Sequence, residues 1–158
     1  MSAAQELVTY LREKKLSICT AESCTGGLIA ASIVDIPGAS EVFEEGYITY
    51  SDFAKMKNLG VSSETIRQFS VVSSPVAEEM AEGAARKSRA DVAVAITGYA
   101  GPDAAEDGTV AGTVYIGIYY KDNACSYHLR LDGGRNEVRR QAAQEALALV
   151  LDTVQNGG

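Results

Sequence analysis

The chain has 158 residues, of which 46% are hydrophobic, and this length and composition favour one domain with a buried core. Its formal net charge of −7 and sequence pI near 4.7 oppose broad binding to nucleic acid, which generally needs a basic face. The first residues lack a signal-peptide pattern and no apolar run approaches bilayer length, so we expect a soluble, cytoplasmic protein without a membrane partner. Three cysteines without a CxxC pair support neither a disulfide framework nor a zinc site.

Helices and strands alternate in the first part of the chain. Helical spacing of apolar residues, strand-favouring runs and turn residues define five elements there. They are a helix over 5–13, a strand over 16–20, a helix over 28–34, a strand over 42–50 and a helix that opens at 51–52 and runs through 59. Each of the two strands therefore leads through a polar junction into a helix.

The second part begins with a helix and ends with one. A hydroxyl cap, an early proline and acidic residues mark the start of a helix over 73–87. It is followed by a continuous apolar strand over 91–97, a glycine-rich loop over 98–112, a hairpin of strands 113–120 and 125–131 around Lys121-Asp122-Asn123, and a helix over 136–154.

This order predicts an α/β fold, a single three-layer α/β/α domain over 1–158 with a mixed parallel and antiparallel sheet. Ligands of such sheets sit beyond the carboxyl ends of the strands. The polar junctions before Ser23, before Ser51 and at Thr97 are therefore expected to converge on one pocket.

Ser23 lies at the first strand-to-helix junction, in the run Thr20-Ala21-Glu22-Ser23-Cys24-Thr25-Gly26-Gly27. Backbone N–H groups and the helix dipole at such a turn suit a phosphate or an oxyanion, so Thr25, Gly26 and Gly27 are candidates to hold one. The spacing is equally compatible with Ser23 or Thr25 as a helix cap and two glycines that only permit the turn.

A neutral serine needs a nearby base to act as a nucleophile at pH 7. Lys55 lies just inside the next predicted helix, where a desolvated amine with a lowered pKa would accept the proton of Ser23. Tyr50, which ends the strand before it, is a candidate to relay or orient that proton. The alternative is a solvated helical lysine and a core tyrosine.

The remaining candidates follow the later strands. Gly98-Tyr99-Ala100-Gly101-Pro102 is not a dinucleotide fingerprint, because it opens no helix and lacks the third glycine, but it is a shaped binding loop. The planar fork of Arg135 suits a phosphate or a carboxylate, although an arginine near a helix start is often structural. The single histidine, His128, lies in a strand-like run and is expected to be structural or exposed.

Taken together, these segments resemble the CinA C-terminal domain family, whose active members are nicotinamide mononucleotide deamidases. The resemblance spans almost the whole chain and is carried by Ala21-Glu22-Ser23-Cys24-Thr25-Gly26-Gly27, Phe43-Glu44-Glu45-Gly46-Tyr47-Ile48-Thr49-Tyr50-Ser51 with Lys55, Val72-Ser73, Thr97-Gly98-Tyr99-Ala100-Gly101-Pro102 and Gly112-Thr113-Val114. It implies hydrolysis of the carboxamide of nicotinamide mononucleotide to nicotinic acid mononucleotide and ammonia, a pyridine-nucleotide salvage step. Ser23 is then the nucleophile, Lys55 and Tyr50 activate it, Thr97 lies in the substrate pocket and Arg135 binds the ligand or organises the pocket.

The resemblance implies no metal and no cofactor, and a small-molecule nucleotide as the partner. A homodimer is expected, because most soluble homo-oligomers are closed and two-fold. The chain departs from the family pattern at Tyr99, Ala104-Ala105 and Gly134. These departures leave two alternatives to the deamidase: a catalytically inactive relative that binds a nucleotide, and an amidohydrolase with a shifted substrate.

Overall fold

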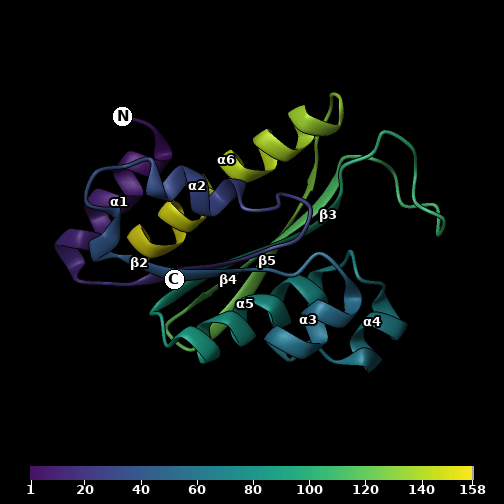
Figure 1. Ribbon diagram of the computed structural model, residues 1–158, viewed down its shortest axis with the longest axis horizontal. Coiled ribbons are helices and arrows are strands. Elements are labelled where there is room, and N and C mark those ends of the chain that lie inside the picture. The colour runs from purple at the N-terminus through teal and green to yellow at the C-terminus, as the bar shows by residue number, and fades with distance from the viewer. Residues whose placement is uncertain (158) are drawn as a thin grey trace.

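Five strands form one mixed sheet in the order β2-β1-β3-β4-β5 (Figure 1). The computed structural model describes residues 1–157. The strands are β1 (Ile18–Glu22), β2 (Phe43–Ile48), β3 (Val92–Tyr99), β4 (Thr113–Tyr120) and β5 (Asn123–Arg130). β1 pairs in parallel with β2 and β3, whereas β3–β4 and β4–β5 are antiparallel. The predicted mixed sheet is confirmed.

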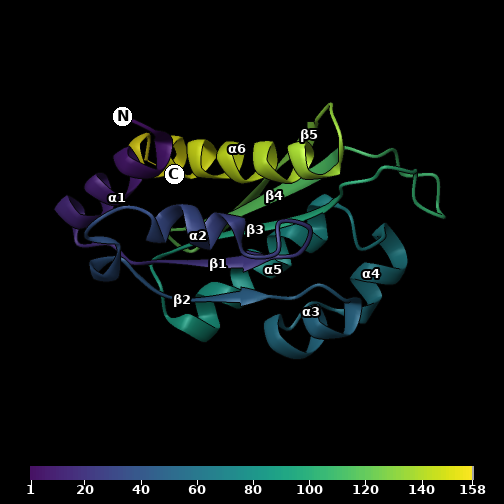
Figure 2. The same cartoon turned by 45° about the horizontal axis from the view of Figure 1, so that its top comes forward.

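Helices cover both faces of this sheet, which confirms the predicted three layers (Figures 1 and 2). One layer holds α1 (Ala3–Lys14), α2 (Leu28–Val34) and α6 (Arg135–Gln155), and the other holds α3 (Asp52–Leu59), α4 (Ser63–Phe69) and α5 (Ser74–Ser88). Two separate clusters of buried apolar side chains fill the space on either side of the sheet. β1 is buried along its whole length, as is β3 from Val92 to Thr97, because both strands lie inside the sheet between the helix layers.

The strand boundaries differ from the predicted ones by a few residues. β1 continues to Glu22 and β3 to Tyr99, while β2 stops at Ile48. Parallel pairing explains the longer β1, since Glu22 faces Ile48 on one side and Ile96 on the other. The apolar pattern could not show this, because the last residues of β1 and β3 are partly polar. The 3₁₀ helix η1 (Ala39–Glu41) and α4 were also not predicted.

The hairpin of β4 and β5 turns on two residues rather than three. Lys121 and Asp122 both have positive φ, 51° and 59°, which matches the twist of the flanking strands in a type I′ turn. His128 lies on β5, is exposed and stacks on Tyr115 with ring centroids 4.6 Å apart, as expected for a structural histidine. Within residues 1–157, none of the helices is both long and apolar enough to cross a bilayer.

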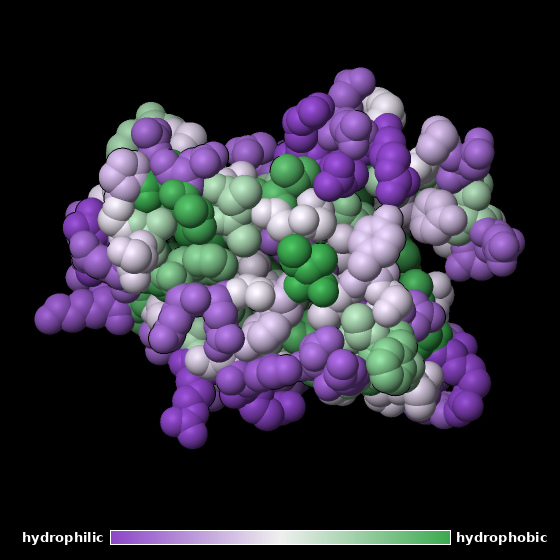
Figure 3. All heavy atoms as spheres, in the orientation of Figure 1, coloured by the Kyte–Doolittle hydropathy of each residue, from purple (hydrophilic) through white to green (hydrophobic). Residues whose placement is uncertain are grey.

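The carboxyl ends of β1 and β3 lie side by side, and the long loop between β3 and β4 projects from the same end of the molecule (Figures 1 and 2). Hydrophobic and neutral side chains occupy much of the centre of the face seen in Figure 3, within a hydrophilic border. The fold therefore brings the turn after β1, the end of β3 and the start of α6 to one place.

Candidate functional site

Ser23 and Lys55 meet in the interior of the protein. Ser23 is the first residue after β1 and is 7% exposed, while Lys55 lies on α3 and is 2% exposed. The Nζ atom of Lys55 donates hydrogen bonds to Oγ of Ser23 at 2.9 Å and to the backbone oxygen of Thr49 at 2.8 Å. A serine hydroxyl in hydrogen-bond contact with a buried amine is the arrangement expected of a nucleophile and its base.

The surroundings of Lys55 favour the neutral amine. Burial lowers the pKa of Lys55 below its usual value of 10.5, and the nearby charge of Asp52 raises it by a smaller amount. Within residues 1–157, no carboxylate forms an ion pair with Lys55. A lysine that loses its proton more easily can take up the proton of Ser23.

Cys24 is the other nucleophilic side chain at this turn, and its chemistry differs from that of Ser23. Burial raises the pKa of the Cys24 thiol to about 11, so the thiol is protonated at neutral pH. Lys55 donates to the hydroxyl of Ser23 and not to this thiol. The geometry therefore favours Ser23 as the nucleophile.

Glu22, which sequence reasoning did not select, caps the start of α2. Its buried carboxylate accepts hydrogen bonds from four donors: Oγ1 of Thr25 at 2.6 Å and the backbone N–H groups of Gly27 at 3.1 Å, Ile29 at 2.9 Å and Ala30 at 3.0 Å. The expectation that Gly26 and Gly27 hold a ligand oxygen therefore does not fit, since the N–H of Gly27 bonds to Glu22 and that of Gly26 to the backbone oxygen of Ser23. Thr25 is fully buried and its hydroxyl serves the cap.

Arg139, also missed from the sequence, holds the turn from the side of α6. Its Nε donates to the backbone oxygen of Cys24 at 2.9 Å and its Nη2 to that of Thr25 at 3.1 Å. Asn136, one turn earlier on the same helix, accepts from Nη1 of Arg139 at 3.0 Å. One guanidinium therefore holds two consecutive peptide groups directly after Ser23.

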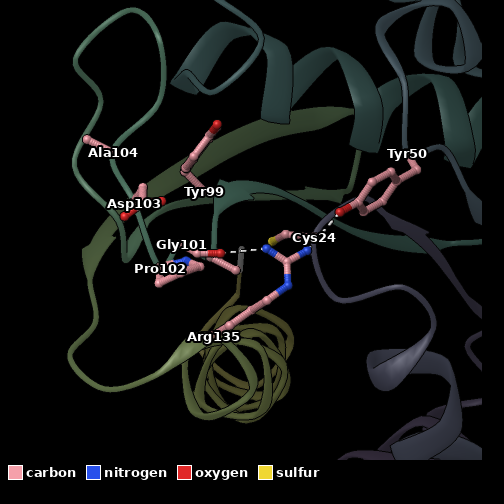
Figure 4. Close-up of a pocket in the computed structure, with 9 residues that line it drawn as sticks. Cys24, Tyr50, Tyr99, Gly101, Pro102, Asp103, Ala104 and Arg135 are labelled. Atoms are coloured by element: carbon pink, nitrogen blue, oxygen red, sulfur yellow. Dashed lines mark hydrogen bonds between the residues drawn. The ribbon is translucent and has the colours of Figure 1, made fainter.

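A pocket of about 440 Å³ opens beside the turn (Figure 4). Its lining consists of Cys24, Tyr50, Tyr99, Ala100, Gly101, Pro102, Asp103, Ala104 and Arg135. Arg135 extends from the start of α6 and donates to the backbone oxygen of Gly101 at 2.6 Å and to the hydroxyl of Tyr50 at 3.0 Å. Within residues 1–157, three of the five guanidinium N–H groups of Arg135 have no hydrogen-bond partner.

Tyr50 has a different place from the one expected. Tyr50 is 63% exposed and its hydroxyl accepts a hydrogen bond from Arg135, not from Ser23 or Lys55 (Figure 4). The β2 strand ends two residues before Tyr50, which lets the side chain turn toward the pocket. Tyr50 is thus a wall of the pocket in this structure, and Arg135 fixes its position.

Thr97 and Gly98 shape the site from within β3. Oγ1 of the buried Thr97 donates to the backbone oxygen of Val71 at 2.9 Å, which ties β3 to the segment before α5 and leaves Thr97 outside the pocket lining. A Cβ atom on Gly98 would lie 2.9 Å from Val114 Cγ2 and 3.2 Å from the sulfur of Cys24. Tyr99 follows at the pocket mouth and points away from Arg135 (Figure 4).

Two sequence signals pointed to the residues that were missed. Glu22 is a carboxylate at the end of a buried strand, and a buried charge requires several hydrogen-bond partners. Arg139 stands four residues after Arg135, which is the spacing of neighbours on one helix face. The spacing of Arg139 does not identify its partners at the turn, because Cys24 and Thr25 lie more than a hundred residues earlier in the chain.

Solved structures of similar sequence share this fold. One is described as a competence-damaged protein (CinA) superfamily protein from Escherichia coli, with a TM-score of 0.92 and 39% identity over 94% of this chain and 87% of that chain. Another is described as competence damage-inducible protein A (ComA) from Klebsiella pneumoniae subsp. pneumoniae, with a TM-score of 0.96 and 33% identity over 99% and 97% of the two chains.

Curated relatives extend the similarity to longer proteins. A CinA-like protein of Kosmotoga olearia is 45% identical over 149 residues, which are 94% of this chain and 36% of that protein. A CinA-like protein of Akkermansia muciniphila is 43% identical over 152 residues, or 96% and 37%. The chain thus spans little more than a third of the length of these relatives. Residues 1–154 match the family described as the CinA C-terminal domain, and the chain belongs to that family.

Proposed function

We propose that this protein is a serine amidohydrolase that converts nicotinamide mononucleotide to nicotinic acid mononucleotide and ammonia. The observation that carries the proposal is the 2.9 Å contact between Nζ of the buried Lys55 and Oγ of Ser23. The chain belongs to the CinA C-terminal domain family. The resemblance to the active members of that family supports the choice of substrate.

The neutral amine of Lys55 starts the reaction. Oγ of Ser23 forms a bond to the carboxamide carbon, its proton moves to Nζ of Lys55, and the π electrons of the carbonyl move to its oxygen. Lys55 then gives the proton to the amide nitrogen, the C–N bond breaks, and ammonia leaves an acylated Ser23. Water attacks this ester, and its proton passes through Lys55 back to Oγ, which releases the carboxylate product.

The pocket matches the rest of the substrate. The faces of Tyr50 and Tyr99 offer an aromatic environment for a positively charged pyridine ring, and the free N–H groups of Arg135 suit its phosphate. Cys24 lines this pocket and directly follows Ser23 in the chain, whereas Ser23 itself is not part of the lining. The intact pair of Ser23 and Lys55 favours an active enzyme over an inactive nucleotide-binding relative.

The test compares wild type with Ser23→Ala. Ammonia and nicotinic acid mononucleotide are measured with nicotinamide mononucleotide as substrate, and Ser23→Ala is expected to reduce turnover at least about a thousandfold. Ser32→Ala is the matched control, because Ser32 lies on α2 and its hydroxyl donates to the backbone oxygen of Leu28. Turnover by folded Ser23→Ala at the wild-type rate would refute the covalent mechanism. A wild type that binds the nucleotide and forms no product would instead support the inactive relative.

A further inference from the structure

Almost every backbone N–H of the turn from Ser23 to Ala30 has a partner. Glu22 accepts three of them, from Gly27, Ile29 and Ala30, and backbone oxygens accept three more, from Ser23, Gly26 and Leu28. Among the residues that the structure describes, the N–H groups of Cys24 and Thr25 have no acceptor. Buried backbone N–H groups are rarely left unpaired, and Cys24 and Thr25 are both buried.

Arg139 sets the direction in which one of these free N–H groups points. The peptide bond between Cys24 and Thr25 is trans, so its N–H points opposite to its carbonyl. That carbonyl accepts from Nε of Arg139, so the N–H of Thr25 points away from α6 and toward the other face of the sheet. The helix α3, which carries Lys55, lies in the helix layer on that face (Figure 1).

We propose that the N–H groups of Cys24 and Thr25 form the oxyanion hole of this enzyme, and that Arg139 is the positioning residue that fixes the peptide group between these two residues. The proposal rests on Ser23 as the nucleophile of the proposed function. When Oγ of Ser23 bonds to the carbonyl carbon, the electron pair moves to the oxygen, and two adjacent donors next to the nucleophile stabilise that charge. Glu22 keeps the neighbouring donors away from the substrate, because its carboxylate accepts the N–H groups of Gly27, Ile29 and Ala30.

The guanidinium suits this task better than an amine. Its Nε and Nη2 bind two carbonyls in a fixed fork, whereas the ammonium of a lysine is a point charge on a flexible stem. Arg139 does not line the pocket and, among residues 1–157, makes no hydrogen bond to Ser23 or Lys55. Its loss should therefore act on the chemical step rather than on ligand binding or on the base.

The experiment measures acylation of Ser23 by p-nitrophenyl acetate, an activated ester that needs no nucleotide recognition. The burst of p-nitrophenolate is recorded for wild type, Arg139→Ala and Arg139→Lys, and the acetylated residue is identified by peptide mass. Arg140→Ala is the matched control, since Arg140 is the next residue on α6, is exposed and makes no hydrogen bond within residues 1–157. We expect Arg139→Ala to be acylated roughly 100-fold more slowly and Arg140→Ala at the wild-type rate.

Two further readouts separate positioning from a purely structural role. Added methylguanidinium, but not methylammonium, should restore part of the rate of Arg139→Ala, and with nicotinamide mononucleotide kcat should fall while KM changes little. A folded Arg139→Ala or Arg139→Lys protein that is acylated at the wild-type rate overturns the proposal. The proposal is also overturned if Arg139→Ala is folded and slow but methylguanidinium does not raise its rate. If Arg139→Ala does not fold, the rate of Arg139→Lys decides.

The two proposals fail in different ways. A wild type that is acylated at Ser23 but does not hydrolyse nicotinamide mononucleotide overturns the substrate and leaves the effect of Arg139 measurable. A wild type that shows neither acylation by the ester nor turnover of the nucleotide overturns both proposals, because Ser23 is then not a nucleophile.

Discussion

Replacement of Glu22 by glutamine tests how the turn that carries Ser23 is held. The carboxylate has three donors on Oε1 and one, the N–H of Ala30, on Oε2 at 3.0 Å. In Glu22→Gln the amide oxygen can keep the three donors on one side. The amide nitrogen then faces the N–H of Ala30, where two donors meet and no hydrogen bond forms.

The expected cost follows from these contacts. Hydrogen bonds to a charged group contribute about 1.5–3 kcal/mol each and neutral ones about 0.5–1.5 kcal/mol, so one bond is lost and three are weakened. The neutral amide avoids the desolvation cost of a buried carboxylate, which offsets part of that loss. We expect the free energy of unfolding of Glu22→Gln to fall by about 2–4 kcal/mol, and the melting temperature by roughly 5–15 °C for a chain of this size.

The assay is thermal and urea unfolding followed by circular dichroism. Glu44→Gln is the matched control, because it removes the same charge from an exposed position on β2 and should change stability by less than about 0.5 kcal/mol. If Glu22→Gln unfolds within about 0.5 kcal/mol of wild type, the carboxylate is not the cap that the four contacts describe, and the reasoning is refuted.

Four further predictions concern the buried amine of Lys55 and two glycines. Lys55→Met should abolish turnover. Wild-type turnover should rise with pH, because the neutral amine is the active form and burial lowers the pKa of Lys55. A rate that falls from about pH 6 to about pH 9 would contradict this. The unfolded chain binds a proton at Lys55 more readily than the folded chain does. Between the lowered pKa of Lys55 and 10.5, the free energy of unfolding of wild type should therefore rise with pH. Urea titrations should show no such rise in Lys55→Met. Gly83→Ala should destabilise the protein by about 1–3 kcal/mol in urea unfolding despite the better helix propensity of alanine, because a Cβ atom there would lie 1.8 Å from the backbone oxygen of Leu59. Gly134→Ser should instead raise the melting temperature slightly, since Gly134 is the uncapped N-cap of α6 and Glu137 stands at the spacing of a capping box; an unchanged or lower temperature would count against a capping role.

Most of the fold could be predicted from the sequence. The strands, five of the helices and the mixed, three-layer arrangement follow from apolar spacing, glycines and helix caps, all of which are properties of residues close together in the chain. The missed α4 has seven residues, of which only Ile66 and Phe69 are apolar, and two apolar residues are too few to mark a helix. The role of Lys55 as a base was predicted from its place after a strand, and the contact with Ser23 fits that prediction.

The placement of Tyr50, Thr97 and the glycines after Ser23 could not be predicted in the same way. Their partners are Arg135, Val71 and Glu22, and two of these three contacts join segments that are far apart in the sequence. A hydroxyl or an N–H at a strand end can serve a ligand or a neighbouring element, and local pattern does not distinguish the two. Only the packing of the neighbouring element shows which one it serves.

The sequence by itself determined that strand, polar turn and helix follow one another at Ser23, since hydrophobic period and turn residues act over a few positions. The tertiary structure alone decided which groups meet there. Parallel pairing of β1 with β2 brings Lys55 to Ser23 across 32 residues, and the packing of α6 brings Arg139 to Cys24 across 115 residues. Contacts of 2.9 Å between such distant residues depend on the register of the sheet and the packing of both helix layers, which no local pattern specifies.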